Sequence, residues 1–238
     1  MIPREKPEFR TVAGMPLWSM EVYYRLLNCG FRIAVSAGSA SGVKASPVGY
    51  NRVYVRLDGA FSYENWFKAL KVGRSFGANG PMLLLQVNGV GVGGTVKIEG
   101  GKGLKARAED SSVGPLDRLD LISKGRAVRT VTAPDPSGRL VAEFETGADE
   151  RGWFAARCFE RPTSTIRFAH TSPVYVDTGK GAATVAEDAR YFVAWIDREM
   201  EFYRRGTRFK RPEDHAAMLL FFESARRVYA DLARGERD

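Results

Sequence analysis

Residues 82–98, MLLLQVNGVGVGGTVKI, decide how the fold of this chain is interpreted. Two short apolar runs, 82–87 and 95–98, flank a glycine-rich turn that begins with Asn88-Gly89. An Asn-Gly pair between apolar runs is a strong signal for a β-hairpin. Residues 89–94 also match GxGxxG, but the dinucleotide-binding fingerprint requires a helix after the glycines, and the run that follows has strand character. The stretch therefore predicts a hairpin and not a cofactor loop.

Short strand-like runs continue downstream of this hairpin. They are separated by turn signals at a spacing that is typical of a β-sandwich. The sequence predicts an antiparallel β-sandwich over residues 82–180. The runs that carry this prediction are 104–109, 116–123, 127–133, 139–146, 153–160 and 166–176.

The end of the chain reads as two amphipathic helices. Ala189, Phe192 and Ile196 begin one apolar face, and Phe222 and Tyr229 belong to a second. We expect residues 181–238 to form a helical hairpin that packs on the sandwich.

The stretch before residue 82 has a different pattern. Residues 16–28 predict a helix, 31–37 a buried strand, 38–51 a flexible loop, 52–57 a strand and 63–71 a helix. A helix followed by a strand is one step of a layered α/β unit, and one such step cannot bury its own faces. The predicted class is α+β, with a partial α/β unit that lacks part of its sheet.

Composition excludes several classes of protein. The 238 residues are 44% hydrophobic and 27% charged, which is ordinary for a globular chain and excludes a disordered or collagen-like one. No apolar run is long enough to span a membrane, and the first residues show no secretory signal, so the compartment stays open. Cys29 and Cys158 fit no CxxC metal or redox pattern and are expected to be buried thiols.

The net charge of +8 raises the question of a nucleic-acid partner. The basic residues are scattered, and the densest group is Arg204-Arg205 with Arg208, Lys210 and Arg211. Because a nucleic-acid footprint needs a contiguous basic stripe, we expect none here.

Histidine is scarce, with only His170 and His215 in the chain. His170 stands beside Thr171-Ser172. It could act as a base or as a ligand, or it could be a structural residue held by hydrogen bonds. Ser39, Ser41 and Ser172 have no assigned base, so an independent hydrolase that uses His170 and a serine is the weakest interpretation.

Several blocks together resemble the carbaryl-hydrolase-like (CehA/McbA-type) branch of the PHP-domain metallohydrolases. The resemblance runs from about residue 16 to near the end. Its main blocks are YYRLLNCGFR at 23–32, AGS at 37–39, PVGYNRVYV at 47–55, ALKVGRSF at 69–76, NGP at 79–81, AHTSPVYV at 169–176 and EDARYF at 187–192.

The resemblance implies that residues 1–81 are the remnant of the last α/β unit of a PHP-like barrel. It implies a divalent metal that activates water against an ester, carbamate or phosphoester, held by an amino-terminal PHP domain or a partner chain. Many members carry Asp where this chain has Ala40, and a methyl group cannot ligate a metal. We therefore expect no metal ligand and no catalytic residue in this chain.

The resemblance implies that this chain contributes one wall of the substrate pocket. The candidate substrate-binding residues are Ser39, Ser41, Asn51, Arg52 and His170. The leading hypothesis is the carboxy-terminal part of a PHP-type hydrolase, truncated or split and inactive alone. The alternative is a non-catalytic β-sandwich that binds a glycan, a protein or a lost barrel partner.

Overall fold

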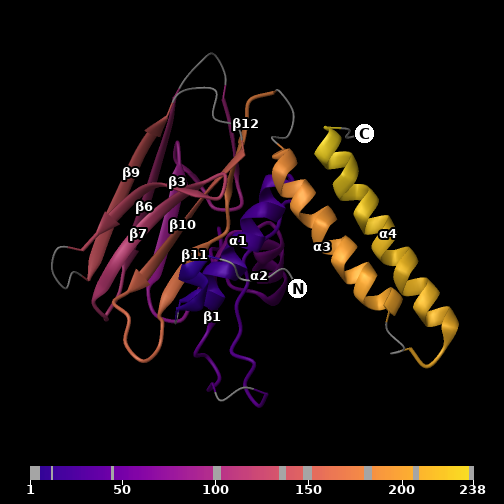
Figure 1. Ribbon diagram of the computed structural model, residues 1–238. Coiled ribbons are helices and arrows are strands. Elements are labelled where there is room, and N and C mark those ends of the chain that lie inside the picture. The colour runs from indigo at the N-terminus through magenta and orange to yellow at the C-terminus, as the bar shows by residue number, and fades with distance from the viewer. Residues whose placement is uncertain are drawn as a thin grey trace. The chain divides into compact units, whose positions relative to one another are not determined.

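The chain is a mixed α+β protein in which two β-sheets and a carboxy-terminal pair of helices are the main elements (Figure 1). It forms two compact units, one made of Met1–Phe31 with Ala183–Asp238 and the other of Arg32–Ala182. The computed structural model describes residues 6–11, 13–43, 46–98, 103–133, 138–146, 152–179, 184–205 and 209–235.

The unit formed by Arg32–Ala182 contains the strands and one helix, α2 (Tyr63–Lys71). Its strands are β1 (Arg52–Val55), β2 (Ser75–Ala78), β3 (Met82–Val87), β4 (Val90–Gly91), β5 (Thr95–Lys97), β6 (Leu104–Ser111), β7 (Leu116–Ser123), β8 (Arg126–Thr132), β9 (Arg139–Thr146), β10 (Gly152–Glu160), β11 (Phe168–Thr171) and β12 (Val174–Asp177).

The strands form two sheets. The smaller has the order β4-β3-β6-β9, and the larger runs β1-β2-β11-β10-β12-β5, with β7 on the other edge of β10 and β8 beyond it. Every pairing is antiparallel except that of β12 with β5. The antiparallel sheets of the prediction are therefore confirmed. Because β1 and β2 join the larger sheet, the stretch before residue 82 contributes directly to it; its interpretation as a barrel remnant stays a prediction.

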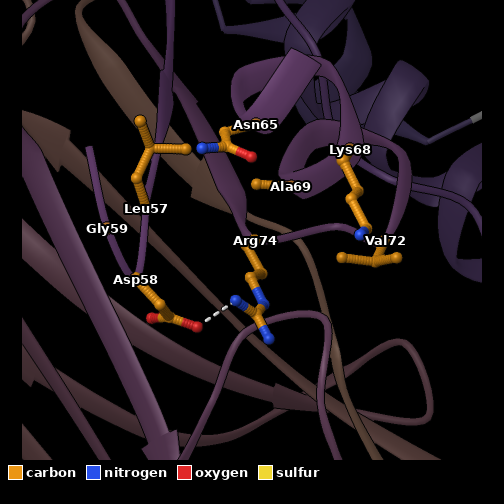
Figure 2. A pocket seen from close by; sticks show the side chains of 8 residues that line it. All are labelled: Leu57, Asp58, Gly59, Asn65, Lys68, Ala69, Val72 and Arg74. Atoms are coloured by element: carbon orange, nitrogen blue, oxygen red, sulfur yellow. Dashed lines mark hydrogen bonds and ion pairs between the residues drawn. The ribbon is translucent and has the colours of Figure 1, made fainter. Parts of the chain in front are cut away.

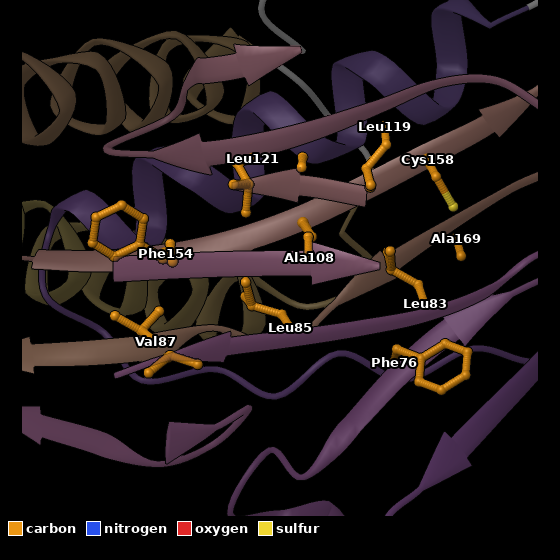
Figure 3. Close-up of a cluster of buried hydrophobic side chains, with 14 of the residues drawn as sticks. Phe76, Leu83, Leu85, Val87, Ala108, Leu119, Leu121, Phe154, Cys158 and Ala169 are labelled. Carbon is orange, nitrogen blue, oxygen red and sulfur yellow. The ribbon is translucent and has the colours of Figure 1, made fainter. Parts of the chain in front are cut away.

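The two sheets share one apolar core (Figure 3). Along β3 buried and exposed residues alternate, so Leu83, Leu85 and Val87 point inward. From the larger sheet, Leu121 and Phe154 are fully buried in the same cluster. Full burial of one such side chain contributes about 1.5–3 kcal/mol, so this interleaved face holds the sheets together.

The glycine-rich stretch forms the predicted hairpin. Asn88 and Gly89 have φ of 46° and 79°, as a two-residue turn between twisted strands requires, and β3 pairs with β4 across it. Gly93 lies against the end of α2, where a Cβ atom would stand 2.4 Å from the carbonyl oxygen of Val72. Strand β5 follows, so the glycines serve a turn and a close backbone approach.

Helix α2 begins and ends where the sequence predicts. The hydroxyl of Ser62 accepts a hydrogen bond from the Asn65 amide at 3.1 Å, which satisfies one unpaired donor of the first turn. Gly73, at φ 81°, follows the last turn in the left-handed conformation that glycine adopts without strain.

The other unit contains the 3-10 helix η1 (Pro7–Arg10) and the helices α1 (Gly14–Asn28), α3 (Ala186–Arg205) and α4 (Pro212–Arg234). The helices α3 and α4 pack side by side, and the ring of Phe192 stacks on that of Tyr229 at 4.8 Å. The predicted helical pair is confirmed; its packing on the sandwich stays a prediction.

Helix α1 is fixed to the start of α3 by a buried polar contact. Arg25 donates to one oxygen of Asp188 at 2.6 Å, and the Asn28 amide donates to the other at 2.8 Å. Asp188 lies in the first turn of α3, where a carboxylate also interacts favourably with the helix dipole. The contact joins two segments that are 160 residues or more apart in the sequence.

Three features considered from the sequence are the cysteines, a membrane-spanning helix and the densest basic group. Cys29 and Cys158 are both buried thiols, as expected. No described helix combines the length and apolar character that a membrane span needs. Arg208, in the densest basic group, lies outside the described residues.

The prediction of a buried strand at residues 31–37 is wrong. The segment is not part of any described sheet, and all of its residues are half-buried or exposed. A run with strand character needs a neighbouring strand to form a backbone ladder, and among the described residues none is supplied. The segment is held by side chains instead.

Candidate functional site

The segment Arg32–Ala37 lies on the face of β2 that points away from the shared core, because Ser75 and Gly77 face it whereas Phe76 and Ala78 belong to the core. Two buried serines, Ser75 and Ser172, hold the segment by hydrogen bonds to the backbone of Val35. The Val35 amide donates to the Ser172 hydroxyl at 2.8 Å, and the Ser75 hydroxyl donates to the Val35 carbonyl at 2.7 Å. Ser172, a serine that the sequence analysis considered as a nucleophile, therefore has a structural role.

The sequence of β2 makes room for this segment. A Cβ atom on Gly77 would stand 3.1 Å from the Cβ of Ala37 and 3.3 Å from a methyl group of Val35. Arg32 adds an anchor at the start of the segment, because its guanidinium lies 4.4 Å from the ring centre of Tyr175. The segment is thus seated closely although it has no ladder.

Among the described residues, nothing pairs with one edge of the segment's backbone. In an extended chain, the amides of successive residues point to opposite sides. Val35 uses one side to contact the two serines, whereas the backbone groups of Ala34 and Ser36 make no hydrogen bond with any described residue. This edge has the hydrogen-bonding pattern that another strand would fill.

The loop that follows the segment brings together two of the predicted substrate-binding residues. The Asn51 amide donates to the Ser39 hydroxyl at 2.9 Å, and that hydroxyl donates to the Asn51 carbonyl at 3.3 Å. The side-chain amide of Asn51 also donates to the carbonyl of Gly38 at 3.3 Å. The two ends of the loop are therefore tied together, with Lys44 and Ala45 outside the described residues.

Ser41 and Arg52 are not drawn into this contact. Both are exposed, and the Arg52 guanidinium lies 6.0 Å from the ring centre of Tyr54. Ala40, between the two loop serines, has φ of 49°, a left-handed conformation that Asn and Asp adopt more readily than alanine. The side chains of Ser41 and Arg52 remain accessible beside the tied loop.

His170 lies on β11, two strands away from β1, which corresponds to about 10 Å. It is buried, and its Nδ1 lies 2.7 Å from the carbonyl oxygen of Thr171. Burial, together with the nearby charge of Arg157, lowers its pKa to about 4. The imidazole is therefore neutral at pH 7, and Nδ1 carries the proton that it donates to Thr171. This geometry favours the structural interpretation of His170.

A partly buried ion pair that the sequence did not reveal lies beside His170. The strand registers place Thr130, Asp120, Arg157 and His170 in one row across β8, β7, β10 and β11. Asp120 is 2% exposed and accepts from Thr130 at 2.7 Å and from Arg157 at 2.9 Å. The only sequence signal was an aspartate within the otherwise apolar run of residues 119–122.

This row does not provide a metal site. The described part of the chain holds no group of three or more His, Cys, Asp and Glu side chains that could ligate an ion. The Asp120 carboxylate is bound by Thr130 and Arg157, and Nδ1 of His170 is bound to a backbone carbonyl.

Comparison of the chain with protein-family models, with curated proteins and with solved structures found no match.

Proposed function

We propose that this chain is the carboxy-terminal part of a larger PHP-type metal-dependent hydrolase, and that it does not hydrolyse substrates alone. Ester, carbamate and phosphoester substrates follow from the sequence resemblance. The observation that carries the proposal is the segment Arg32–Ala37, an extended run with one unfilled backbone edge.

The chemistry of this edge supports a missing strand. Unpaired backbone donors and acceptors beside half-buried apolar side chains form a template for pairing with another strand. The side chains of Ile33, Ala34 and Val35 are only partly buried, so a second strand would cover apolar surface as well as fill the ladder. An amino-terminal PHP domain, or a partner chain that carries one, would supply both.

The loop 38–51 has a defined role in this proposal. Loops that follow the carboxyl end of a strand in layered α/β folds are the usual place for a binding site. Ser39 and Asn51 would form a fixed part of the pocket wall, and Ser41 and Arg52 would present accessible polar groups beside it. His170 would support the wall from within the larger sheet.

The test uses the purified chain with added Zn²⁺ or Mn²⁺. Metal content after gel filtration and hydrolysis of p-nitrophenyl acetate and p-nitrophenyl phosphate are measured. We expect no stoichiometric metal and no turnover above the metal-only control. Metal-dependent turnover that co-purifies with the folded chain would overturn the proposal.

A second candidate function is a non-catalytic binding module. Exposed aromatic side chains favour it: Phe61 is 80% exposed and Tyr63 75%, and the ring of Phe67 lies 4.5 Å from that of Tyr63. Aromatic rings in such an arrangement provide apolar faces for sugars or protein side chains. Glycan binding that is lost in a Tyr63→Ala/Phe67→Ala variant of unchanged fold would support this function, and unchanged or absent binding would exclude a glycan at these rings.

A further inference from the structure

A cavity of about 380 Å³ lies between the end of β1 and helix α2, in the unit formed by Arg32–Ala182. Its apolar lining comes from Leu57, Ala69 and Val72. Figure 2 shows the pair of Asp58 and Arg74 at one end of the pocket. A pocket with a mostly apolar lining and a few polar groups is the usual form of a small-molecule site.

Short-range backbone contacts fix the walls of this pocket. The Arg56 amide donates to the Arg74 carbonyl at 2.8 Å, which joins the two sides of the pocket next to β1 and β2. The Arg74 amide donates to the Ala69 carbonyl at 3.0 Å, and Gly73 between them has φ of 81°. All lining residues lie within one stretch of the chain, residues 57–74, so the pocket depends on local structure alone.

The charges around the pocket favour an anion. Arg74 donates to the Asp58 carboxylate, and the Nε atom of Arg56 lies 4.0 Å from the other oxygen of that carboxylate. Lys68 lines the pocket, and its ammonium group forms no hydrogen bond or ion pair with any described residue. Two positive charges and one negative charge line the cavity, and within the described part of the chain the charge of Lys68 is the one that has no partner.

We propose that this pocket binds a small organic carboxylate. The carboxylate group pairs with Lys68 and with the free edge of the Arg74 guanidinium, and the hydrocarbon part lies on Leu57, Ala69 and Val72. A monoanion suits the site better than a phosphate dianion, because Asp58 already occupies one side of Arg74 and repels a second negative charge.

The test is a titration of ¹⁵N-labelled chain with benzoate, followed by amide chemical shifts, with benzamide as an uncharged probe of the same shape. Benzoate is expected to bind saturably and to shift amides within residues 57–74, whereas benzamide binds at least several-fold more weakly. Lys68→Gln is expected to weaken benzoate binding about tenfold, because it replaces the ammonium group of a charge-assisted contact with a neutral, shorter polar side chain.

Two further variants make the outcome specific. Lys71→Gln is the matched control: Lys71 is on the same helix and is also exposed to solvent, but it does not line the pocket, so benzoate binding is expected to stay unchanged. Asp58→Asn is expected to tighten binding a few-fold, because it removes the competing carboxylate. The proposal is overturned by the absence of saturable shifts, by equal affinity for benzamide, or by equal losses in Lys68→Gln and Lys71→Gln.

Discussion

Asp110 is a carboxyl group placed in the apolar core between the two sheets. It occupies an inward position of β6, is 1% exposed, and accepts a hydrogen bond from the Leu140 amide at 2.9 Å. Its second carboxyl oxygen is buried and has no hydrogen-bond partner among the described residues. Loss of solvation raises the pKa of Asp110 from 3.8 to about 6, although the Leu140 amide and the nearby Cys158 thiol act to lower it.

The direction of this pKa change determines how the stability of the fold depends on pH. Because the folded state binds the proton more tightly than the unfolded state, Asp110 is best accommodated below about pH 4, and stability is lost as the pH rises through about 6. At 1.36 kcal/mol per pKa unit, the full effect is up to about 3 kcal/mol at pH 7.5. Asp110→Asn keeps an acceptor for the Leu140 amide and removes the charge.

We therefore expect Asp110→Asn to stabilise the chain by about 1–2 kcal/mol at pH 7.5, after the cost of a buried amide, and to give no gain at pH 4.5. Urea unfolding followed by circular dichroism at both pH values measures this difference. Glu145→Gln on β9 is a control that removes an exposed carboxylate. An equal effect of Asp110→Asn at both pH values, or a loss at pH 7.5, would refute the reasoning.

Three further predictions concern the hairpin glycines, the buried serines and the buried histidine. Gly93→Ala places a Cβ atom 2.4 Å from a carbonyl oxygen and is expected to lower the free energy of unfolding by more than about 2 kcal/mol, whereas Gly89→Ala, with a similar φ but open space, costs about 1 kcal/mol; equal losses in urea unfolding would contradict the packing argument. Ser172→Ala leaves the Val35 amide without its acceptor and is expected to cost about 1–3 kcal/mol in the same assay, and a neutral change would contradict the seating of the segment. His170, with its pKa lowered to about 4, stabilises the fold fully above about pH 6.5 and loses this contribution as the pH falls toward 4; its imidazole proton resonances are expected to stay constant between pH 5.5 and 8, and a midpoint above 6 would show that it is not buried as described.

The sequence predicted those elements whose signals are local. Alternation along residues 82–87 identified the inward face of β3, and Asn88-Gly89 identified the turn that follows. Ser62 and Gly73 marked the ends of α2, because a cap and a left-handed glycine act within one turn of a helix. The strand prediction for residues 31–37 was wrong, because strand character shows only that a run is suited to a β-ladder. The neighbouring strand that completes the ladder has to come from elsewhere in the structure.

The site was predicted only in part for the same reason. Ser39 and Asn51 were chosen from the sequence, and the loop closes through them. The partnership of Asp120 with Arg157 depends on the register between β7 and β10, which no local pattern specifies. Likewise the surroundings of His170, which make it neutral, come from strands far apart in the sequence.

The account depends most on the segment Arg32–Ala37 having one backbone edge that no described residue pairs with. Amide hydrogen exchange of the isolated chain, followed by NMR residue by residue, tests this directly. The account predicts a protected amide at Val35, which is bound to Ser172, between rapidly exchanging amides at Ala34 and Ser36. Slow exchange at all three positions would contradict it, because the outer edge would then already be paired.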